Sequence, residues 1–346
     1  MIVAGGTGGH IFPALLLFKE FKKLKHEVFF ICREEDKTKF KERLKSISNF
    51  IYPIKSAGLK RKSIEKFFIG IFILLISLKQ SYSLIKTLNP DLVVGFGGYI
   101  SFAPSLVAHW LGKKVVLFEQ NSIPGLSNKM IYKFADKTFL NYEYTKKWFP
   151  KGIYLSQPVN TKIGTITKSK ALEYWNMSKK KKTLFILGGS QGAQSINELI
   201  LENNTALADF NILWSTGKQH LKKIRNKVDR KNIVVRGFIN KMEWAWAVAD
   251  LVIARAGAST ISEIKQAGVP SILIPYPFAT ENHQYFNALE IEKKGMGFVI
   301  EEKNLNFSTL KNKIDKIIKN LGQYKKRLMK TKIKNEQIAK IILKSV

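Results

Sequence analysis

The 346-residue chain is predicted to be an α/β protein made of two doubly wound domains that face a cleft. Three observations predict this class. The length suggests about two domains. Short β-branched runs alternate with helical periodicity along the chain, as in parallel α/β folds. Apolar residues make up 45 % of the chain, so each half can bury a core of its own.

The expected strands form two series, and each strand leads into a segment with helical periodicity. A break that contains prolines and glycines, 149–164, separates the two series. We therefore expect an N-terminal domain over 1–157 and a C-terminal domain over 158–324. A lysine-rich helix over about 325–346 has apolar residues spaced to pack back on the first domain. The expected strands are 1–4, 26–33, 49–54, 91–96, 114–119 and 137–142, then 183–189, 211–216, 232–238, 250–257, 271–277 and 297–300.

The net charge of +32, from 58 Lys and Arg against 26 Asp and Glu, has three interpretations. It can reflect nucleic-acid binding, a compositional drift toward lysine, or attraction to an anionic membrane or substrate. The basic residues are spread along the whole chain and no recognised nucleic-acid motif occurs, so nucleic acid is not an expected partner. The single cysteine, Cys32, and a start without a secretory signal favour a reducing cytosol.

Residues 59–82 add a local reason to expect membrane contact. Their apolar run, 67–78, is shorter than the ~20 residues that a bilayer span needs, so we do not expect it to cross a membrane. An apolar face rimmed by lysines is typical of a helix that lies in the membrane interface. The alternative is an ordinary buried helix. The residues expected to contact the membrane are Lys60, Arg61, Lys62, Phe67, Phe68 and Phe72.

Three glycine-rich turns each follow an expected strand: GGTGGH (5–10), GFGGY (95–99) and GGSQGA (188–193). Glycine allows positive φ and lets backbone N–H groups approach an anion. The helix start that follows each turn adds positive partial charge. The first turn lacks the third glycine of a dinucleotide fingerprint, and it lacks the Gly-Lys-Ser/Thr of a P-loop. These turns therefore favour phosphate binding of another kind.

Two polar segments follow strands of the second series. In ASTISE (258–263) a diphosphate can lie at the helix start while the Glu263 carboxylate accepts from both hydroxyls of a ribose. The alternative is a capping box made with Ser259 or Thr260. In FATENHQYFNA (278–288) the amides and carboxylates suit sugar hydroxyls, and the alternative is helix capping by Thr280.

Six stretches together resemble a known family: GGTGGHIFPAL, GFGGYISFAP, EQNSIPGLSNK, GGSQGAQSIN, GFINKM and RAGASTISEIKQAGVPSILIPYPFATENHQYFNA. They are similar, in order over most of the chain, to the peptidoglycan N-acetylglucosaminyltransferases of glycosyltransferase family 28. The resemblance implies the GT-B arrangement of two Rossmann-like domains. It also implies inverting, metal-independent transfer of N-acetylglucosamine, without a cofactor, from UDP-N-acetylglucosamine to undecaprenyl-diphosphate-muramyl-pentapeptide (lipid I), which gives lipid II.

The same resemblance implies a peripheral place on the cytoplasmic face of the anionic cell membrane, with other cell-wall synthesis proteins as partners. It assigns Ser190 to the donor diphosphate, Ile239 to the uracil and Gln284 to the sugar hydroxyls. The implied donor-binding residues are Thr7, Gly8, Gly9, Asn121, Asn160, Ser190, Ile239, Ala258, Ser259, Thr260, Ile261, Ser262, Glu263 and Gln284. The implied acceptor-diphosphate residues are Gly5, Gly6, Gly97, Gly98 and Tyr99.

The sequence departs from the family pattern at four positions. The family usually has arginine at Asn160, histidine at Phe118, a small residue at Phe102 and glutamine at His283. The resemblance therefore implies no cationic contact to the donor at position 160, where asparagine stands in place of arginine. The other three departures affect local details of the site more than the reaction.

The chemistry requires a base for the attacking hydroxyl and stabilisation of the leaving diphosphate. Asp-x-Asp, common in metal-dependent transferases, does not occur in the sequence. The helix start at 258–260 and backbone N–H groups near Ser190 can stabilise the leaving group, with help from Arg255. His10 directly follows a glycine turn, and a histidine at its ordinary pKa of ~6.5 can accept a proton at pH 7. The alternative is that His10 only positions the turn or a substrate.

Three other functions are also compatible with the sequence. The chain can be a GT-B transferase with another lipid acceptor, such as diacylglycerol. It can be a UDP-N-acetylglucosamine 2-epimerase on a similar fold. It can also be a non-enzymatic basic protein that binds membranes or RNA.

Overall fold

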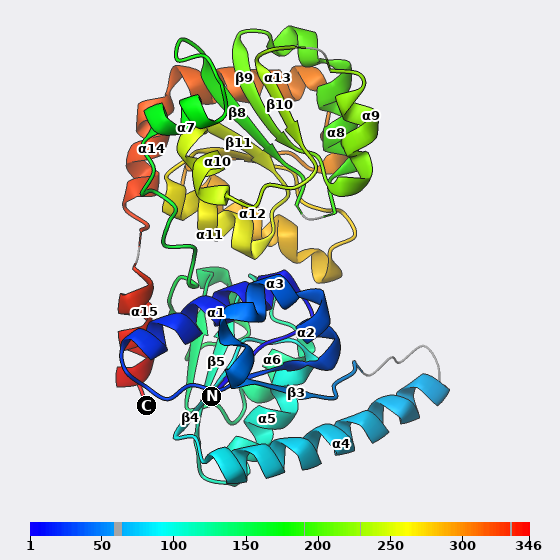
Figure 1. The fold of residues 1–346 in the computed structure, drawn as a ribbon, viewed down its shortest axis with the longest axis vertical. Coiled ribbons are helices and arrows are strands. Elements are labelled where there is room, and N and C mark those ends of the chain that lie inside the picture. Colours follow the sequence, from blue (N-terminus) through cyan, green and yellow to red (C-terminus); the bar gives the residue numbers. More distant parts are fainter. Residues whose placement is uncertain (59–63, 190, 229, 333) are drawn as a thin grey trace. The chain divides into compact units, whose positions relative to one another are not determined.

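The computed structural model describes residues 1–58, 64–189, 191–228, 230–332 and 334–346. The chain divides into two compact units, Met1–Val159 with Lys334–Val346, and Asn160–Ile333. Each unit is a parallel β-sheet covered by helices (Figure 1). The predicted α/β class with two doubly wound sheets is confirmed.

The sheet of unit 1 has seven strands in the order β3-β2-β1-β4-β5-β6-β7. Because β1 pairs with both β2 and β4, the strand order reverses beside β1, and ligands of such sheets bind at this switch point. The strands are β1 (Ile2–Val3), β2 (Phe30–Arg33), β3 (Ile51–Ile54), β4 (Leu92–Gly95), β5 (Lys114–Glu119), β6 (Lys137–Leu140) and β7 (Ile153–Tyr154). The helices are α1 (Gly8–Lys23), α2 (Glu34–Lys39), α3 (Lys41–Leu44), α4 (Ile64–Leu88), α5 (Tyr99–Trp110), α6 (Leu126–Ile131) and α15 (Asn335–Lys344), with 3₁₀ segments η1 (Lys45–Phe50) and η2 (Glu143–Lys147).

The sheet of unit 2 has six strands in the order β10-β9-β8-β11-β12-β13, with the switch point between β8 and β11. The strands are β8 (Lys182–Leu187), β9 (Phe210–Ser215), β10 (Ile233–Arg236), β11 (Leu251–Ala254), β12 (Ser271–Leu273) and β13 (Gly297–Val299). The helices are α7 (Lys168–Tyr174), α8 (Gln194–Glu202), α9 (Leu221–Arg225), α10 (Met242–Val248), α11 (Ala258–Ala267), α12 (His283–Lys293), α13 (Phe307–Lys319) and α14 (Leu321–Met329), with 3₁₀ segments η3 (Asn204–Leu207), η4 (Lys218–His220), η5 (Thr280–Asn282) and η6 (Glu302–Asn304).

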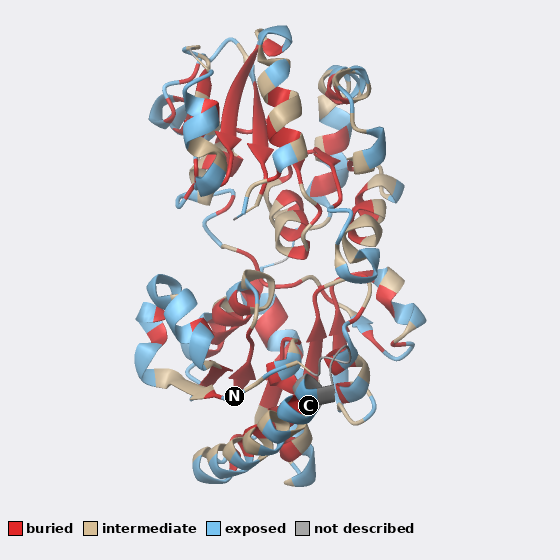
Figure 2. Cartoon of the chain, turned by 90° about the vertical axis from the view of Figure 1, so that its right-hand side faces the viewer, coloured by how far each residue is buried: buried red, intermediate tan, exposed pale blue. Residues whose placement is uncertain are grey.

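The central strands are buried on both faces, which explains their continuous apolar runs (Figure 2). In unit 1, Val115 and Leu117 of β5 pack in one cluster with Ile100 and Val107 of α5. In unit 2, the strands pack against α8 and α13. There the indole of Trp214, fully buried, donates to Asn197 Oδ1 at 2.9 Å, so its one polar atom is satisfied.

The break expected at 149–164 contains one element that the sequence pattern did not indicate. Strand β7 pairs with β6 through only two residues, Ile153 and Tyr154. A strand this short has no periodicity to detect, because period-2 alternation needs about four residues.

The C-terminal segment returns to unit 1, but later than expected. Helix α14 belongs to unit 2, and the return begins at Lys334. The Asn335 amide then accepts from Val159 N at 3.0 Å and donates to Val159 O at 2.7 Å. Helix α15 packs on α1 with Ile338 and Ile342 fully buried, whereas Ile341 is 40 % exposed. Only part of the expected apolar face is therefore used.

Helix α4 is longer than the apolar run in the sequence. Its segment Phe68–Leu88 is, among the described residues, the one helical stretch long and apolar enough to span a bilayer by length and composition alone. The helix continues past residue 78 through a half-polar segment, so it is longer than the apolar run itself, and the expectation that it does not cross a membrane stays a prediction. The helix packs along α5, and its residues Ser77, Ser81 and Ile85 are buried.

Candidate functional site

The GGTGGH loop leaves β1 at the switch point of unit 1. Gly6 has φ +90°, a conformation that favours glycine. A Cβ on Gly5 would lie 2.6 Å from Asp36 Oδ2, so a side chain there would displace this carboxylate. Helix α1 then begins at Gly8, after Thr7 as its N-cap residue. The loop is therefore packed tightly on its inner side, while Thr7 is exposed.

Asp36 lies under this loop, and it is not among the site residues predicted from the sequence. Its fully buried carboxylate accepts from Gly6 N at 2.8 Å and from Arg33 Nε and Nη2, each at 2.8 Å. Burial opposes ionisation, but the hydrogen bonds from Arg33 and Gly6 outweigh it and lower the pKa of Asp36. The charged cluster directly after a strand, REED (33–36), was the available signal.

His10 lies in the first turn of α1, with its ring turned to the loop. Nδ1 is 3.2 Å from the Gly5 carbonyl oxygen and 3.3 Å from Thr7 Oγ1. A carbonyl oxygen can only accept, so we assign the ring proton to Nδ1. Nε2 is then the unprotonated nitrogen, as a general base requires.

The GFGGY loop follows β4 and lies against the first loop. Gly97 and Gly98 have φ of +80° and +75°. A Cβ on Gly98 would lie 3.1 Å from Gly5 O and 3.7 Å from His10 Nδ1. Ser101 Oγ holds Gly97 O at 2.7 Å, and Tyr99 is 57 % exposed at the start of α5. The structure thus brings the two glycine loops together at Gly5, Gly98 and His10, and their assignment to one binding site stays a prediction.

Glu119, at the end of β5, connects Asn121 to this region. It accepts from Asn121 N at 2.8 Å and from Asn128 Nδ2 at 2.6 Å. The Asn128 amide in turn lies 3.0 Å from where a Cβ on Gly97 would be. Burial raises the pKa of Glu119 to about 7, against hydrogen bonds from Asn121 and Asn128 that favour the carboxylate.

A pH dependence of stability follows from Glu119. Its pKa is about 7 in the folded protein against an ordinary 4.5, so between these values the folded protein binds the extra proton. The free energy of unfolding therefore falls as pH rises from about 4.5 to 7. Glu119→Gln removes the titrating group and is expected to make this decrease in the free energy of unfolding smaller by roughly 2–3 kcal/mol. Urea unfolding of both proteins at pH 5 and pH 7.5 measures it, and parallel losses in the two proteins would contradict the shift.

In unit 2, two loops adjoin the switch point, after β8 and after β11. Gly189 and Gly192 of the GGSQGA loop both have φ +80°. Ser190, predicted to contact the donor diphosphate, lies outside the described residues. The Gln191 carbonyl accepts from Gln219 Nε2 at 2.8 Å, which ties this loop to the segment after β9.

The segment after β11 does not form the alternative capping box. Gly257 is the N-cap residue of α11, and no side-chain cap is made. Glu263 instead accepts from Trp246 Nε1 at 2.8 Å, a partner that no local signal in the sequence indicated. Ser259 Oγ and Ser262 Oγ are buried without a hydrogen-bond partner among the residues described. Buried hydroxyls of this kind suit a bound polar ligand. Ala258, Thr260 and Ile261 occupy the same first turns.

The segment before α12 is held in an unusual backbone conformation. Glu281 and Asn282 have φ of +50° and +54°, and Asn282, not Thr280, is the N-cap residue. Gln284 Oε1 accepts from Tyr276 N at 3.1 Å, which fixes the amide so that its nitrogen carries the remaining donors. His283 Nδ1 lies 2.8 Å from Thr280 O.

Arg255 is engaged inside unit 2. It pairs with Glu302 and donates to Ser195 Oγ at 3.1 Å and to the Ile274 carbonyl at 3.2 Å. Its charge is thus already paired, and its help to a leaving diphosphate stays a prediction.

The family departures have local structural explanations. Phe118 stacks on Phe96 with ring centroids 5.2 Å apart, and Phe102 packs against the core of unit 1. Asn160 Oδ1 accepts from Lys162 N at 3.1 Å. Ile239 is only 4 % exposed, while its neighbour Phe238 is 42 % exposed.

Within the described ranges, no group of three or more His, Cys, Asp or Glu residues could hold a metal ion.

Comparisons with known proteins cover nearly the whole chain. The glycosyltransferase family 28 N-terminal domain matches residues 1–140, and the glycosyltransferase family 28 C-terminal domain matches residues 183–343. The chain is 33 % identical over 346 residues to a UDP-N-acetylglucosamine--N-acetylmuramyl-(pentapeptide) pyrophosphoryl-undecaprenol N-acetylglucosamine transferase of Bacillus licheniformis, covering 98 % of this chain and 93 % of that protein. It is 35 % identical over 317 residues to the protein of that name from Flavobacterium psychrophilum, covering 88 % and 85 %.

Solved structures give the same result for the fold. The structure of Acinetobacter baumannii MurG matches with a TM-score of 0.76 at 26 % identity, over 99 % of this chain and 98 % of that one. A Neisseria meningitidis UDP-GlcNAc 2-epimerase matches with a TM-score of 0.67 at 13 % identity, over 99 % and 98 %. The likeness to the epimerase is therefore one of fold alone. The predicted GT-B class is confirmed.

Proposed function

The chain belongs to glycosyltransferase family 28, and on that premise we propose that it transfers N-acetylglucosamine from UDP-N-acetylglucosamine to undecaprenyl-diphosphate-muramyl-pentapeptide (lipid I), giving lipid II for peptidoglycan. The observation that carries the proposal is the identity of 33 % over 98 % of the chain to a transferase named for this acceptor. The loops around His10 and the segment after β11 both lie within the matched length.

In this reaction the acceptor hydroxyl attacks the anomeric carbon of the donor sugar. A new C–O bond forms, the bond to the diphosphate breaks, and UDP leaves with the electron pair. We assign the proton of the hydroxyl to His10 Nε2, because Nδ1 carries the ring proton that faces Gly5. Attack from the face opposite to UDP inverts the anomeric carbon.

The leaving diphosphate needs stabilisation of its growing charge. The N-terminus of α11 supplies backbone N–H groups and a positive helix end, and the buried Ser259 hydroxyl lies in its first turn. We place the ribose on Glu263 and the sugar hydroxyls on Gln284. Preorganised donors at such a position are worth about 3–4 kcal/mol each.

The loops of unit 1 complete the proposal. We assign Gly5, Gly6, Gly97, Gly98 and Tyr99 to the diphosphate of the acceptor lipid. Gly6, Gly97 and Gly98 have positive φ, and their loops lie at the switch point of the sheet, where ligands of such sheets bind. The remaining donor contacts proposed here are Thr7, Gly8, Gly9, Asn121, Asn160, Ser190, Ile239, Ala258, Thr260, Ile261 and Ser262.

The test incubates the protein with UDP-N-acetylglucosamine and a lipid I analogue, with EDTA present throughout. We expect UDP release that requires the acceptor and continues in EDTA. A diacylglycerol acceptor serves as the control. Release with diacylglycerol alone would point to another lipid acceptor, and epimerised sugar without any acceptor would point to a 2-epimerase.

We further propose that the protein lies peripherally on the cytoplasmic face of the membrane and contacts it through α4. Residues spaced alternately four and three apart along α4, from Phe68 to Lys86, form one exposed stripe of the helix. This stripe is apolar in its N-terminal half and basic in its C-terminal half. Phe68, Phe72 and Leu75 are 64 %, 65 % and 58 % exposed, and Lys79 and Lys86 follow on the same stripe. An apolar patch beside ammonium groups suits an anionic lipid surface.

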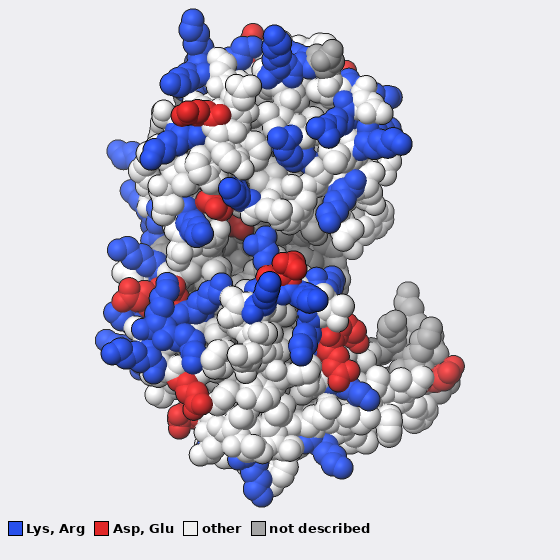
Figure 3. Space-filling model, viewed as in Figure 1, with Lys and Arg blue, Asp and Glu red and all other residues white. Residues whose placement is uncertain are grey.

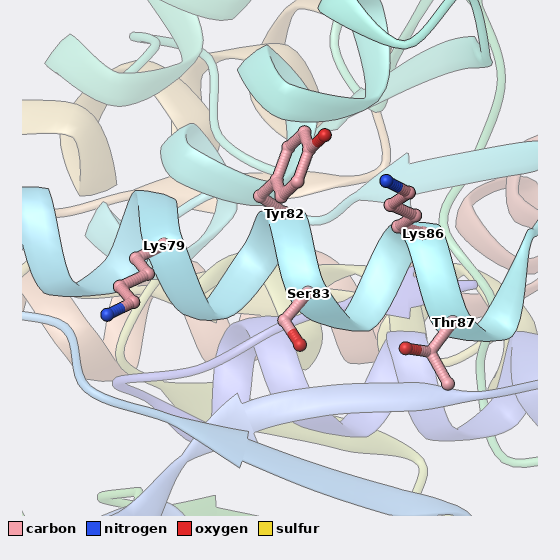
Figure 4. A pocket seen from close by; sticks show the side chains of 5 residues that line it. All are labelled: Lys79, Tyr82, Ser83, Lys86 and Thr87. Carbon is pink, nitrogen blue, oxygen red and sulfur yellow. The ribbon is translucent and has the colours of Figure 1, made fainter.

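The basic end of this stripe lines an open pocket of about 420 Å³, formed by Lys79, Tyr82, Ser83, Lys86 and Thr87 (Figure 4). Lys86 Nζ lies 5.7 Å from the Tyr82 ring centroid, and both side chains project to the same side of the helix. Elsewhere, lysine and arginine side chains are spread over the visible face of both units (Figure 3). The predicted contacts Lys60, Arg61 and Lys62, and the side chain of Phe67, lie outside the described residues.

The α4 contact can be tested with vesicles. Lys79→Gln with Lys86→Gln is expected to weaken binding to anionic vesicles by about 1 kcal/mol per lysine, because each charge attracts the surface. Co-sedimentation at low and high salt measures it. The control is Lys137→Gln with Lys151→Gln, two exposed lysines elsewhere in unit 1. Equal binding to neutral vesicles at high salt would contradict the electrostatic contribution.

A further inference from the structure

The peptide group between Gly5 and Gly6 has a partner on each side. Its N–H, on Gly6, donates to Asp36 Oδ2 at 2.8 Å. Its C=O, on Gly5, lies 3.2 Å from His10 Nδ1. A trans peptide is planar, and its N–H and C=O point in opposite directions. The hydrogen bond to Asp36 therefore determines the direction in which the Gly5 carbonyl meets His10.

Asp36 is itself held rigidly. Arg33 donates to both carboxylate oxygens at 2.8 Å, and the Asp36 side chain is fully buried. The loop above it has little freedom to adjust, since a Cβ on Gly5 would lie 2.6 Å from Asp36 Oδ2 and 3.1 Å from Ile100 Cγ2. A carboxylate can only accept, so it admits one orientation of the 5–6 peptide, with the N–H inward.

We propose that Asp36, held by Arg33, is a positioning residue that fixes the Nδ1-protonated form of His10 through the peptide between Gly5 and Gly6. If this peptide turned over, the Gly6 N–H would replace the carbonyl beside the ring. Nδ1 would then have to accept, and the proton would move to Nε2, where the base must be unprotonated. The role of His10 as the base rests on the proposed function. The effect of Asp36 on the protonated form of the His10 ring does not depend on that function.

The test compares Asp36→Asn with Asp136→Asn. Asp136 is a matched control because it also accepts a backbone N–H, from Val115 at 2.8 Å, and pairs with a cation, Lys114. It precedes β6 and so lies at the other end of the strands from the loops. We expect Asp36→Asn to lower kcat roughly tenfold, as loss of one hydrogen bond implies, with KM for the donor nearly unchanged. We expect Asp136→Asn to leave both unchanged.

A double-mutant cycle separates positioning from general damage. Because Asp36 acts through His10, adding Asp36→Asn to His10→Ala is expected to cause no further loss of kcat. If the double variant instead loses kcat by the product of the two single losses, the proposal is wrong. If Asp36→Asn does not fold, Arg33→Lys provides the same cycle, because lysine keeps the positive charge but loses the paired N–H donors of the guanidinium. We expect Arg33→Lys to lower kcat about threefold when His10 is present and not to lower it further in His10→Ala.

The second measurement is independent of turnover. Imidazole ¹⁵N NMR of the full chain is expected to show His10 protonated at Nδ1, and Asp36→Asn is expected to shift it toward the Nε2-protonated form. An unchanged His10 spectrum in folded Asp36→Asn would overturn the inference. If the wild-type protein shows the expected spectrum but does not transfer the sugar, the proposed function fails and the positioning role of Asp36 stands.

Discussion

Replacement of His10 by alanine is expected to lower kcat by about 10²–10⁴-fold, the usual contribution of a positioned general base. The structure places His10 at the switch point of unit 1, between the two glycine loops. Its Nδ1 faces the Gly5 carbonyl at 3.2 Å, so Nε2 is the nitrogen that accepts the proton. KM for UDP-N-acetylglucosamine should change little, because the donor is assigned mainly to unit 2. Steady-state kinetics with varied donor and acceptor measure both parameters.

His109→Ala is the control for the loss of a histidine, since this exposed residue lies in the last turn of α5 and packs on Phe134. It should keep the wild-type kcat. If His10→Ala keeps its turnover and only acceptor affinity falls, His10 positions the loop or the acceptor and another group is the base.

The second large effect is expected at Glu263. Glu263→Ala should lower kcat/KM for the donor by on the order of 10²–10³-fold, because two hydrogen bonds between a carboxylate and the ribose hydroxyls are lost. The Trp246 indole donates to Glu263 Oε2 at 2.8 Å and orients the carboxylate. Trp246→Phe should therefore cause a smaller loss in the same direction. Exposed Glu173, on α7, provides the control as Glu173→Ala.

A ribose-specific measurement makes this prediction sharper. Calorimetry with UDP and with 2′-deoxy-UDP should show that the wild-type protein prefers UDP and that Glu263→Ala has lost the preference. If the variant discriminates between the two nucleotides as well as the wild-type protein does, Glu263 does not bind the ribose.

Much of the fold was predictable because its signals are local. Continuous apolar runs such as 114–119 predict buried parallel strands. Glycine turns at 5–10 and 95–99 mark strand ends, and the structure shows them on neighbouring strands, β1 and β4. The weak points were elements with little periodicity. Strand β7 pairs through two residues, and the second half of α4 is half polar.

The candidate site was predictable to the level of its loops. The chemistry of glycine, histidine and glutamate at strand ends made His10 and Glu263 candidates, and their roles stay predictions. The partners that hold them were not predictable, and two interpretations changed with the structure. The capping box at Ser259 or Thr260 is absent because Gly257 is the N-cap residue. Thr280 does not cap α12, because Asn282, with a positive φ, occupies the N-cap position and makes no side-chain cap.

By itself, the sequence determined the two-domain α/β class, the family resemblance and the positions of the glycine-rich loops at strand ends. These depend on periodicity and turn residues, which act over a few neighbouring positions. Only the tertiary structure decided which polar groups meet. Asp36 reaches Gly6 across 30 residues, and Asn335 reaches Val159 across 176. Such pairs form because a buried donor or acceptor must find a partner wherever the folded chain brings one, and a sequence does not state which distant residue that will be.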